Sequence, residues 1–245
     1  MEQIAHIETP FKEKFGVPRQ AGLADYEARV VFEPKYRVAE AVRGLEEFEY
    51  VWLIWQFHLN EGERLKVKAE TANDSHLSPL TPHLSSWSPT VRPPRLGGNK
   101  RVGVFATRSP FRPNAIGLSS VRLLRIETGP VLVVGGADLV DGTPILDVKP
   151  YIAYADSHPD ARSGFAQEAP KRLELVDDHG LVDDHGLLLQ LPENLRWTLE
   201  QTLRQDPRPH YQHDPQRVYT MPFDRWEVRF RVTGDAVEVT GLNVK

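Results

Sequence analysis

The sequence predicts a mainly β protein: a closed or nearly closed β structure over residues 1–165 and a small α+β domain over residues 168–245. Short strand-like runs bounded by turn residues dominate the first part, and they include a single helix pattern. These runs do not alternate with helices as β-α units do, and no G-x-G-x-x-G or Walker loop is present. A Rossmann fold is therefore disfavoured.

The strands of the first part are predicted from apolar runs and from alternation of apolar and polar residues. The most apolar run, YVWLIWQF at residues 50–57, predicts a central buried strand. A helix is predicted over residues 37–48, where apolar side chains recur at helical spacing around one glycine. The other predicted strands span residues 4–8, 28–33, 120–126, 130–137 and 145–148.

In the second part, residues 192–205 predict an amphipathic helix, because three leucines recur every fourth position on one face. Strands are predicted over residues 218–221, 226–232 and 237–240. Before the helix, LVDDHG occurs twice in tandem at residues 175–186. We interpret this repeat as a duplicated exposed turn, since its Asp and His residues lack a known metal-ligand spacing.

One stretch, Arg101–Val121, combines apolar flanks with a stiff basic turn. A strand-like run at residues 102–106 leads into TRSPFRPN, and the chain leaves through Ile116–Leu118. Two prolines within the turn remove backbone donors and fix φ, so this turn is neither a helix interior nor a central strand. A rigid polar loop between two strands is a suitable place for function.

Composition excludes several classes of protein. There is no cysteine, which rules out disulfides, Cys-ligated zinc and thiol catalysis and agrees with a cytoplasmic protein. No apolar run approaches the length of a membrane span, and the N-terminus lacks a signal-peptide pattern. The nine histidines show no H-E-x-x-H spacing, and there is no G-x-S-x-G, so neither a metal site nor a serine hydrolase is predicted.

Charge is unevenly distributed. Residues 75–126 contain no Asp or Glu and carry +8, which leaves −12 on the rest because the chain as a whole is at −4. This basic window indicates a local polyanion site, or else a solvated loop that is neutralised by carboxylates nearby in the fold. Residues 62–100, which overlap the first half of this window, are rich in Ser, Thr, Pro and Gly and predict a long irregular excursion.

Three loops carry polar groups beside a proline at the end of a strand-like run: residues 18–20, 108–114 and 141–144. Loops at the strand ends of a barrel tend to converge, so these three are predicted to line one pocket. Arg19 or Arg108 would pair with a carboxylate through the guanidinium fork, and Asp141 would accept from hydroxyl or amino groups. Each loop taken alone is equally consistent with a simple hydrogen-bonded turn.

Six motifs, in order along the chain, resemble those of the TsaA-like, or tRNA methyltransferase O, family. The motifs are FKEKFGVPRQ at residues 11–20, AVRGL at 41–45, VRPPRLGGN at 91–99, VFATRSPFRPNAIGLS at 104–119, DLVDGTPILDVKPY at 138–151 and DPRPHY at 206–211. The resemblance implies an S-adenosylmethionine-dependent enzyme that methylates N6 of threonylcarbamoyladenosine at position 37 of certain tRNAs. It also implies a single β-barrel that binds the cofactor, a small C-terminal domain and a homodimer.

The resemblance also assigns positions to the cofactor. Methyl transfer from a sulfonium is an in-line displacement, in which positioning supplies much of the acceleration. No catalytic base is identified by a motif, and His58 is the one candidate. The cofactor-binding residues implied are Pro18, Arg19, Gln20, His58, Leu59, Arg108, Leu118, Asp141, Gly142, Thr143 and Pro144.

With tRNA as the implied partner, the basic window gains a role: its cations would contact the phosphates of the anticodon loop. Two alternatives remain open, a non-enzymatic RNA-binding module of the same fold and a methyltransferase acting on another nucleotide or on a small molecule. No metal and no membrane is expected. The predicted RNA-binding residues are Arg92, Arg95, Lys100, Arg101, Arg112, Arg122, Arg208 and Tyr211.

Overall fold

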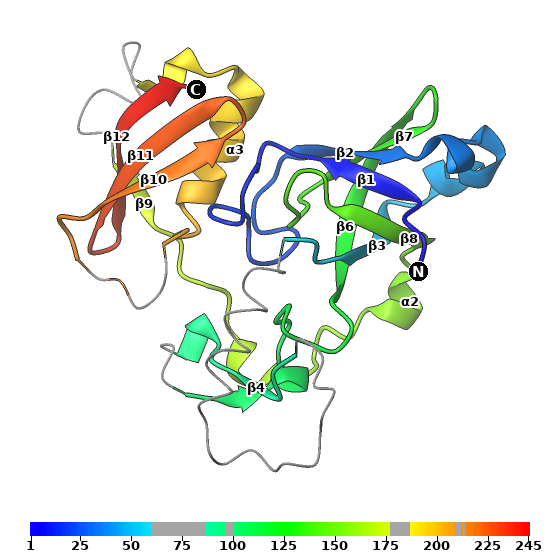
Figure 1. Ribbon diagram of the computed structural model, residues 1–245, viewed down its shortest axis with the longest axis horizontal. Helices are drawn as coiled ribbons and strands as arrows, with labels where there is room; N and C mark the ends of the chain where they lie inside the picture. The colour runs from blue at the N-terminus through cyan, green and yellow to red at the C-terminus, as the bar shows by residue number, and fades with distance from the viewer. Residues whose placement is uncertain (60–86, 97–99, 177–186, 209–211, 213) are drawn as a thin grey trace.

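The computed structural model describes residues 1–59, 87–96, 100–176, 187–208, 212 and 214–245 (Figure 1). Within these residues, six strands close into an antiparallel barrel in the order β1-β2-β7-β6-β3-β8. The predicted closed β structure is therefore confirmed as a barrel. The barrel strands are β1 (Ala5–Glu8), β2 (Glu27–Phe32), β3 (Tyr50–Gln56), β6 (Ile116–Glu127), β7 (Val131–Gly135) and β8 (Pro144–Pro150).

Alternating side chains fill the barrel. On β3, Val51, Leu53 and Trp55 are buried, while the residues between them are partly exposed. This alternation follows from the two-residue period of a strand, which sends successive side chains to opposite faces. Strand β7 is buried along its whole length, as its continuous apolar sequence VLVVG predicts.

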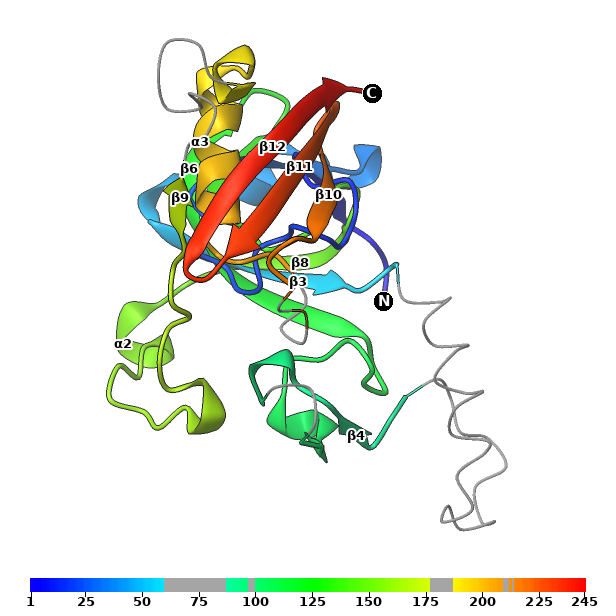
Figure 2. The ribbon, with the colours of Figure 1, turned by 90° about the vertical axis from the view of Figure 1, so that its left-hand side faces the viewer.

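A second sheet has the order β10-β11-β12-β9, and helix α3 (Glu193–Leu203) packs beside it (Figure 2). Leu199 and Leu203 of α3 are fully buried, so the predicted leucine face is the packed face. The predicted helix and three strands are confirmed. Strand β9 is not predicted from the sequence; its last two residues begin the hexapeptide repeat, whose residues 177–186 lie outside the described residues. The strands are β9 (Glu174–Val176), β10 (Val218–Phe223), β11 (Trp226–Thr233) and β12 (Ala236–Val244).

The loop at residues 9–22 connects the barrel to the second sheet. The ring of Phe11 packs edge-on against Tyr26 in the barrel at 5.2 Å and against Phe223 of β10 at 5.7 Å between centroids. The backbone N–H of Asp224 donates to the carbonyl of Pro10 at 2.6 Å. One continuous cluster of buried side chains therefore runs through both sheets. The domain boundary near residues 165–168 remains a prediction.

The predicted helix over residues 37–48 is wrong. The segment forms short 3₁₀ turns, and Gly44 adopts a left-handed conformation with φ of +85° that interrupts any continuous helix. Of its apolar side chains, Val42 is buried, whereas Val38 and Phe48 are exposed. The turns within it are η2 (Ala39–Val42) and η3 (Leu45–Glu47), and a further 3₁₀ turn, η1 (Pro34–Tyr36), precedes the segment.

A basic lobe, defined here as residues 87–96 and 100–112, lies apart from the C-terminal sheet (Figures 1 and 2). Its β5 (Val102–Gly103) pairs with β4 (Thr90–Val91), and the 3₁₀ turn η5 (Val104–Ala106) follows. The strand expected over residues 102–106 is thus shorter than predicted. Most of the excursion expected at residues 62–100 lies outside the described residues.

Four further short elements are described, and three of them are η4 (Pro94–Leu96), α2 (Ala153–Asp156) and η6 (Gly164–Ala166). A 3₁₀ turn, η7 (Leu187–Gln190), precedes α3 and contributes the buried Leu188 to the shared core. Among the described helices, none is long and apolar enough to cross a membrane.

Candidate cofactor and RNA site

Two of the three predicted loops meet through their side chains. The guanidinium of Arg108, in the loop that follows η5, donates a hydrogen bond to the side-chain oxygen of Gln20, in the loop between β1 and β2. Both side chains are exposed, so both have surface available for a ligand. The predicted convergence of residues 18–20 with the basic turn is therefore observed.

A buried polar chain lies beneath this pair. Trp55 Nε1 donates to Ser119 Oγ at 2.9 Å, and Ser119 Oγ donates in turn to Asp138 Oδ1 at 2.5 Å. The backbone N–H of Ala21, next to Gln20, also lowers the pKa of the Asp138 carboxyl. Burial raises the pKa of Asp138, and the bond from Ser119 and the charge of Arg108 offset part of that rise. Asp138 thus interacts electrostatically with both loops.

Sequence reasoning missed Asp138 and Ser119. An acidic residue directly after the buried run VLVVGGA at residues 131–137 was a usable signal, because a carboxylate in that position needs a partner. Its partner Ser119 is 19 residues away and lies within an ordinary strand pattern, so no local spacing connects the two.

The turn at residues 141–144 is held by its own polar side chains. Asp141 accepts from the backbone N–H of Thr9 at 2.9 Å with one oxygen and pairs with Lys12 Nζ at 2.9 Å with the other. Thr143 is buried and donates to the carbonyl of Val140 at 2.6 Å. These two side chains therefore fix the turn against residues 9–12, while Gly142 between them is exposed.

His58 and Leu59 follow strand β3. The N–H of Phe57 donates to the carbonyl of Ala115 at 2.9 Å, which places this segment beside the start of β6. The half-buried His58 has its pKa lowered by burial and by the nearby charge of Lys14, so its imidazole is neutral at neutral pH. On β6, Leu118 is 53% exposed and offers an apolar surface to a ligand.

Arg19 points elsewhere. Its Nη2 donates to the carbonyls of Asp206 at 3.4 Å and Arg208 at 3.0 Å, in the turn that follows α3. Pro18 beside it is buried. In this structure Arg19 joins the loop at residues 18–20 to the C-terminal part of the chain. Its side chain takes no part in the bond between Gln20 and Arg108.

The predicted RNA-binding cations have different surroundings. Six Arg and Lys residues lie in the basic lobe, and none pairs with a carboxylate among the described residues. Arg92 and Lys100 are exposed, and Arg101 donates to Thr90 Oγ1 at 2.9 Å. Arg95 donates to the carbonyl of Glu168 at 2.5 Å. The lobe therefore keeps its positive charge.

Three other predicted cations form hydrogen bonds or ion pairs within the protein. Arg112 Nη1 donates to the carbonyls of its own loop, and Arg122 pairs with Asp25 at 3.3 Å. Arg208 pairs with Asp206 at 2.8 Å, and its side chain is only 11% exposed. Tyr211 lies outside the described residues. Their role with RNA remains a prediction.

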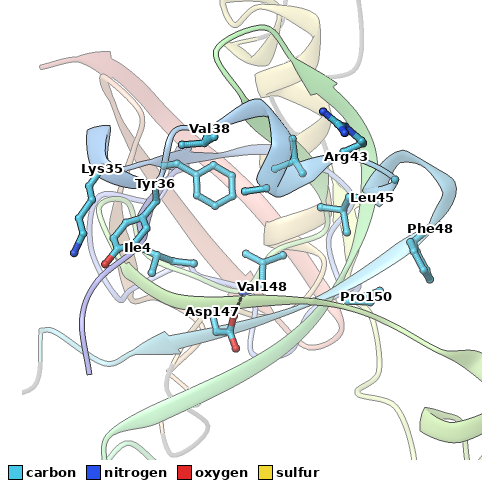
Figure 3. Close-up of a pocket in the computed structure, with 14 residues that line it drawn as sticks. Ile4, Lys35, Tyr36, Val38, Arg43, Leu45, Phe48, Asp147, Val148 and Pro150 are labelled. Carbon is cyan, nitrogen blue, oxygen red and sulfur yellow. Dashed lines mark hydrogen bonds between the residues drawn. The ribbon is translucent and has the colours of Figure 1, made fainter.

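A pocket of about 660 Å³ lies on another part of the barrel (Figure 3). Val38, Arg43 and Leu45 lie on one side of it, and Asp147 and Val148 of β8 lie on the other. None of the predicted cofactor residues lines this pocket. The cluster around Arg108 and Gln20 is therefore a separate, open surface site.

The fold and the site define a two-part β-barrel protein with one electropositive lobe beside a polar ligand site, a class suited to an anionic partner. Residues 6–157 match the tRNA-methyltransferase O N-terminal domain, and residues 185–245 match the C-terminal domain of the same family. The chain belongs to the tRNA-methyltransferase O family.

Three relatives illustrate the likeness. The chain is 41% identical over 252 residues to a tRNA (adenine(37)-N6)-methyltransferase of Escherichia coli K12, covering 98% of this chain and 96% of that one. It is 54% identical over 150 residues to an enzyme of the same description from Eikenella corrodens, covering 60% and 82%. A crystal structure of TrmO from Pseudomonas aeruginosa superposes with a TM-score of 0.71 at 31% identity, covering 99% and 96%.

Proposed function

We propose that this protein methylates N6 of threonylcarbamoyladenosine at position 37 in the anticodon loop of tRNA. As a member of its family, the chain is an S-adenosylmethionine-dependent tRNA (adenine(37)-N6)-methyltransferase. The observation that carries the proposal is the meeting of Arg108, Gln20 and the Asp138 carboxyl beside a lobe of unneutralised positive charge. This arrangement provides adjacent surfaces for a small polar cofactor and for a polyanion.

The cluster fits S-adenosylmethionine in its chemistry. That molecule carries a carboxylate, hydroxyl groups and an apolar base, and it supplies an electrophilic methyl group when bound. The guanidinium of Arg108 is suited to the carboxylate, and the exposed Leu118 is suited to an apolar face. The full proposed set is Pro18, Arg19, Gln20, His58, Leu59, Arg108, Leu118, Asp141, Gly142, Thr143 and Pro144.

The structure suggests two kinds of role within this set. Gln20 and Arg108 present polar groups at the surface, so we assign them to direct contact. Arg19, Asp141 and Thr143 use their side chains in bonds within the protein, so we assign them to holding the loops in place. Contacts from these three to a cofactor would come from their backbone.

His58 is the candidate base. The nitrogen to be methylated belongs to a urea-like group, so its proton is more acidic than that of an amine and a weak base suffices. Burial and Lys14 lower the pKa of His58, which leaves the imidazole unprotonated and able to accept a proton at neutral pH. Its place after β3, beside the start of β6, is consistent with this role.

The tRNA would lie across the basic lobe. Arg92, Lys100 and Arg101 are exposed there and would contact backbone phosphates, while the target base enters the site near Arg108. We further propose that the protein acts as a homodimer in the cytoplasm. The homodimer and the cytoplasmic location are proposed from the resemblance of the motifs to the family.

Two measurements test the function. Isothermal titration calorimetry with S-adenosylmethionine should show binding to the folded protein; absence of binding would leave only an RNA-binding module. Mass spectrometry of tRNA nucleosides from a deletion strain should show threonylcarbamoyladenosine without its N6 methyl group. A different missing nucleoside, with cofactor binding intact, would identify a methyltransferase with another target.

A further inference from the structure

Phe105 lies at the surface of the basic lobe although it is a large apolar residue. Its side chain is 72% exposed, while the preceding Val104 is buried. The N–H of Val104 donates to the carbonyl of Pro89 at 3.0 Å, which fixes turn η5 against the lobe. The turn is therefore anchored through Val104, and the ring of Phe105 faces outward.

The ring has aromatic and cationic neighbours. Trp87 is roughly parallel to it, with an interplanar angle of 25° and 6.2 Å between ring centroids. The guanidinium carbon of Arg112 is 6.0 Å from the Phe105 centroid. At these separations and at 72% exposure, neither neighbour covers the ring. An open aromatic face beside arginine is the arrangement on which unpaired bases stack.

The turn that carries Phe105 is rigidly connected to Arg108. Thr107 N and Oγ1 both donate to the carbonyl of Val104, at 3.1 and 2.8 Å. Arg112 Nη1 closes the loop by donating to the carbonyls of Thr107 at 3.0 Å and Ser109 at 3.3 Å. Positions 105 and 108 are three residues apart, so their Cα atoms are at most roughly 11 Å apart. A base stacked on Phe105 would therefore lie next to the site at Arg108.

Charge identifies the occupant. The described residues 87–96 and 100–112 contain no Asp or Glu, and Arg92, Lys100 and Arg101 are exposed among them. A protein partner for an apolar side chain needs no such excess of positive charge, whereas single-stranded nucleic acid needs both phosphate contacts and stacking surfaces. A base that enters a site leaves the stack of its neighbours, and a neighbouring base then requires a new surface.

We propose that Phe105 is a stacking platform for a base next to the target adenosine in the tRNA loop. This inference rests on the proposed function. The ring contacts of Phe105 are with Trp87 and Arg112 and do not include Trp55, Ser119 or Asp138. Its role is therefore to position RNA and not to bind the cofactor.

The test uses full-length protein and an anticodon stem-loop RNA with 2-aminopurine, a fluorescent base, next to the target adenosine. Parent protein should quench the fluorescence on binding, because stacking quenches 2-aminopurine. Phe105→Ala should lose this quenching and bind the RNA roughly 5- to 150-fold more weakly, while Phe105→Tyr should retain both. Affinity for S-adenosylmethionine should be the same in all three proteins.

Tyr154→Ala is the matched control, since Tyr154 is an exposed aromatic residue, 92% exposed, on α2 outside the basic lobe. It should bind and quench as the parent does. Unchanged quenching and affinity in Phe105→Ala, with a parent that binds cofactor and methylates tRNA, would overturn the stacking role alone. A parent that neither binds cofactor nor methylates tRNA would instead overturn the proposed function.

Discussion

The hydrogen bond from Arg108 to Gln20 joins two loops that are 88 residues apart in the sequence. Gln20 precedes Ala21, whose N–H lowers the pKa of Asp138, and Asp138 accepts a hydrogen bond from Ser119 of β6. The surface pair therefore lies in the electrostatic environment of a carboxyl that is itself bonded to the barrel wall. A ligand that meets Arg108 meets a side chain oriented by its bond to Gln20.

Replacing Arg108 with lysine should weaken the binding of S-adenosylmethionine by roughly 10- to 100-fold, because a lysine lacks the planar fork that bonds a carboxylate in two places. Calorimetry of the folded variant measures the change. Arg43→Lys is the matched control: Arg43 is an exposed arginine between η2 and η3 and should bind cofactor as the parent does. Equal affinity of the Arg108→Lys variant and the parent would remove Arg108 from the cofactor site.

Asp138 should give the protein a descending step in stability at acidic pH. Burial raises the pKa of its carboxyl, so the folded chain holds a proton over a pH range in which the unfolded chain has lost it. The free energy of unfolding should then fall as pH rises from the unfolded pKa through the folded pKa. Asp138→Asn should lack this step in urea denaturation at a series of pH values.

Asp25→Asn is the control for that experiment, because it removes an exposed carboxylate, the partner of Arg122, from the neighbouring loop. This variant should keep the descending step. Parallel pH curves for the parent and Asp138→Asn would show that the carboxyl does not titrate differently in the folded chain.

His58→Ala should lower kcat at saturating cofactor by about 10²-fold or more if His58 accepts the proton. Lys14→Gln provides a finer test. The charge of Lys14 contributes to lowering the pKa of His58, so its removal should raise that pKa and move the acid limb of the kcat profile to higher pH. Methyl transfer intact in His58→Ala would exclude the role, and an unmoved acid limb in Lys14→Gln would assign the limb to another group.

Sequence patterns predicted the barrel strands and the C-terminal helix because their burial follows local periodicity. Strand β3 alternates around Val51, Leu53 and Trp55, and α3 buries Leu199 and Leu203 as their spacing requires. The helix predicted near Gly44 failed for a local reason as well: apolar residues at helical spacing do not fold as a helix across a glycine with φ of +85°. Here the left-handed conformation of Gly44 outweighs the helical spacing of the apolar residues.

The site was predictable only in part. Arg108 and Gln20 were predicted to lie close together, and they do. The bond from Arg19 to a carbonyl 189 residues away, in contrast, is not predicted from the sequence. An arginine next to a proline in a loop has the same local sequence whether its side chain faces a ligand or bonds a backbone carbonyl. Only the packing of residues 9–22 against the second sheet distinguishes them, and no local pattern encodes that packing.

Charge reversal at Arg92 should weaken tRNA binding with little change in cofactor affinity. Arg92 is exposed on the basic lobe, so Arg92→Glu should also reduce the slope of log affinity against log salt by about 1, as expected for a lost phosphate contact. Arg43→Glu is the control, since Arg43 pairs with Glu40 on η2, outside the lobe. Equal tRNA binding by Arg92→Glu and the parent in low salt would contradict the placement of the RNA.

The loop at residues 9–22 offers a sharp test of how the two sheets are joined. Gly16 has φ of +96°, and a Cβ atom there would lie 2.1 Å from the sulfur of Met221. Gly44 has a similar φ of +85° with no atom within 4 Å of the Cβ position. Gly44→Ala should therefore cost only the backbone strain, about 1–2 kcal/mol.

Gly16→Ala should cost that strain plus about 1–3 kcal/mol for the clash with Met221. Chemical denaturation of the parent, Gly44→Ala, Gly16→Ala, Met221→Ala and the double variant Gly16→Ala with Met221→Ala separates the two contributions. In the double variant the shortened side chain leaves room for the new methyl group, so the two changes should cost less together than the sum of the single changes. Additive costs would mean that Met221 does not press on residue 16, and that the junction between loop and sheet is looser than the distances indicate.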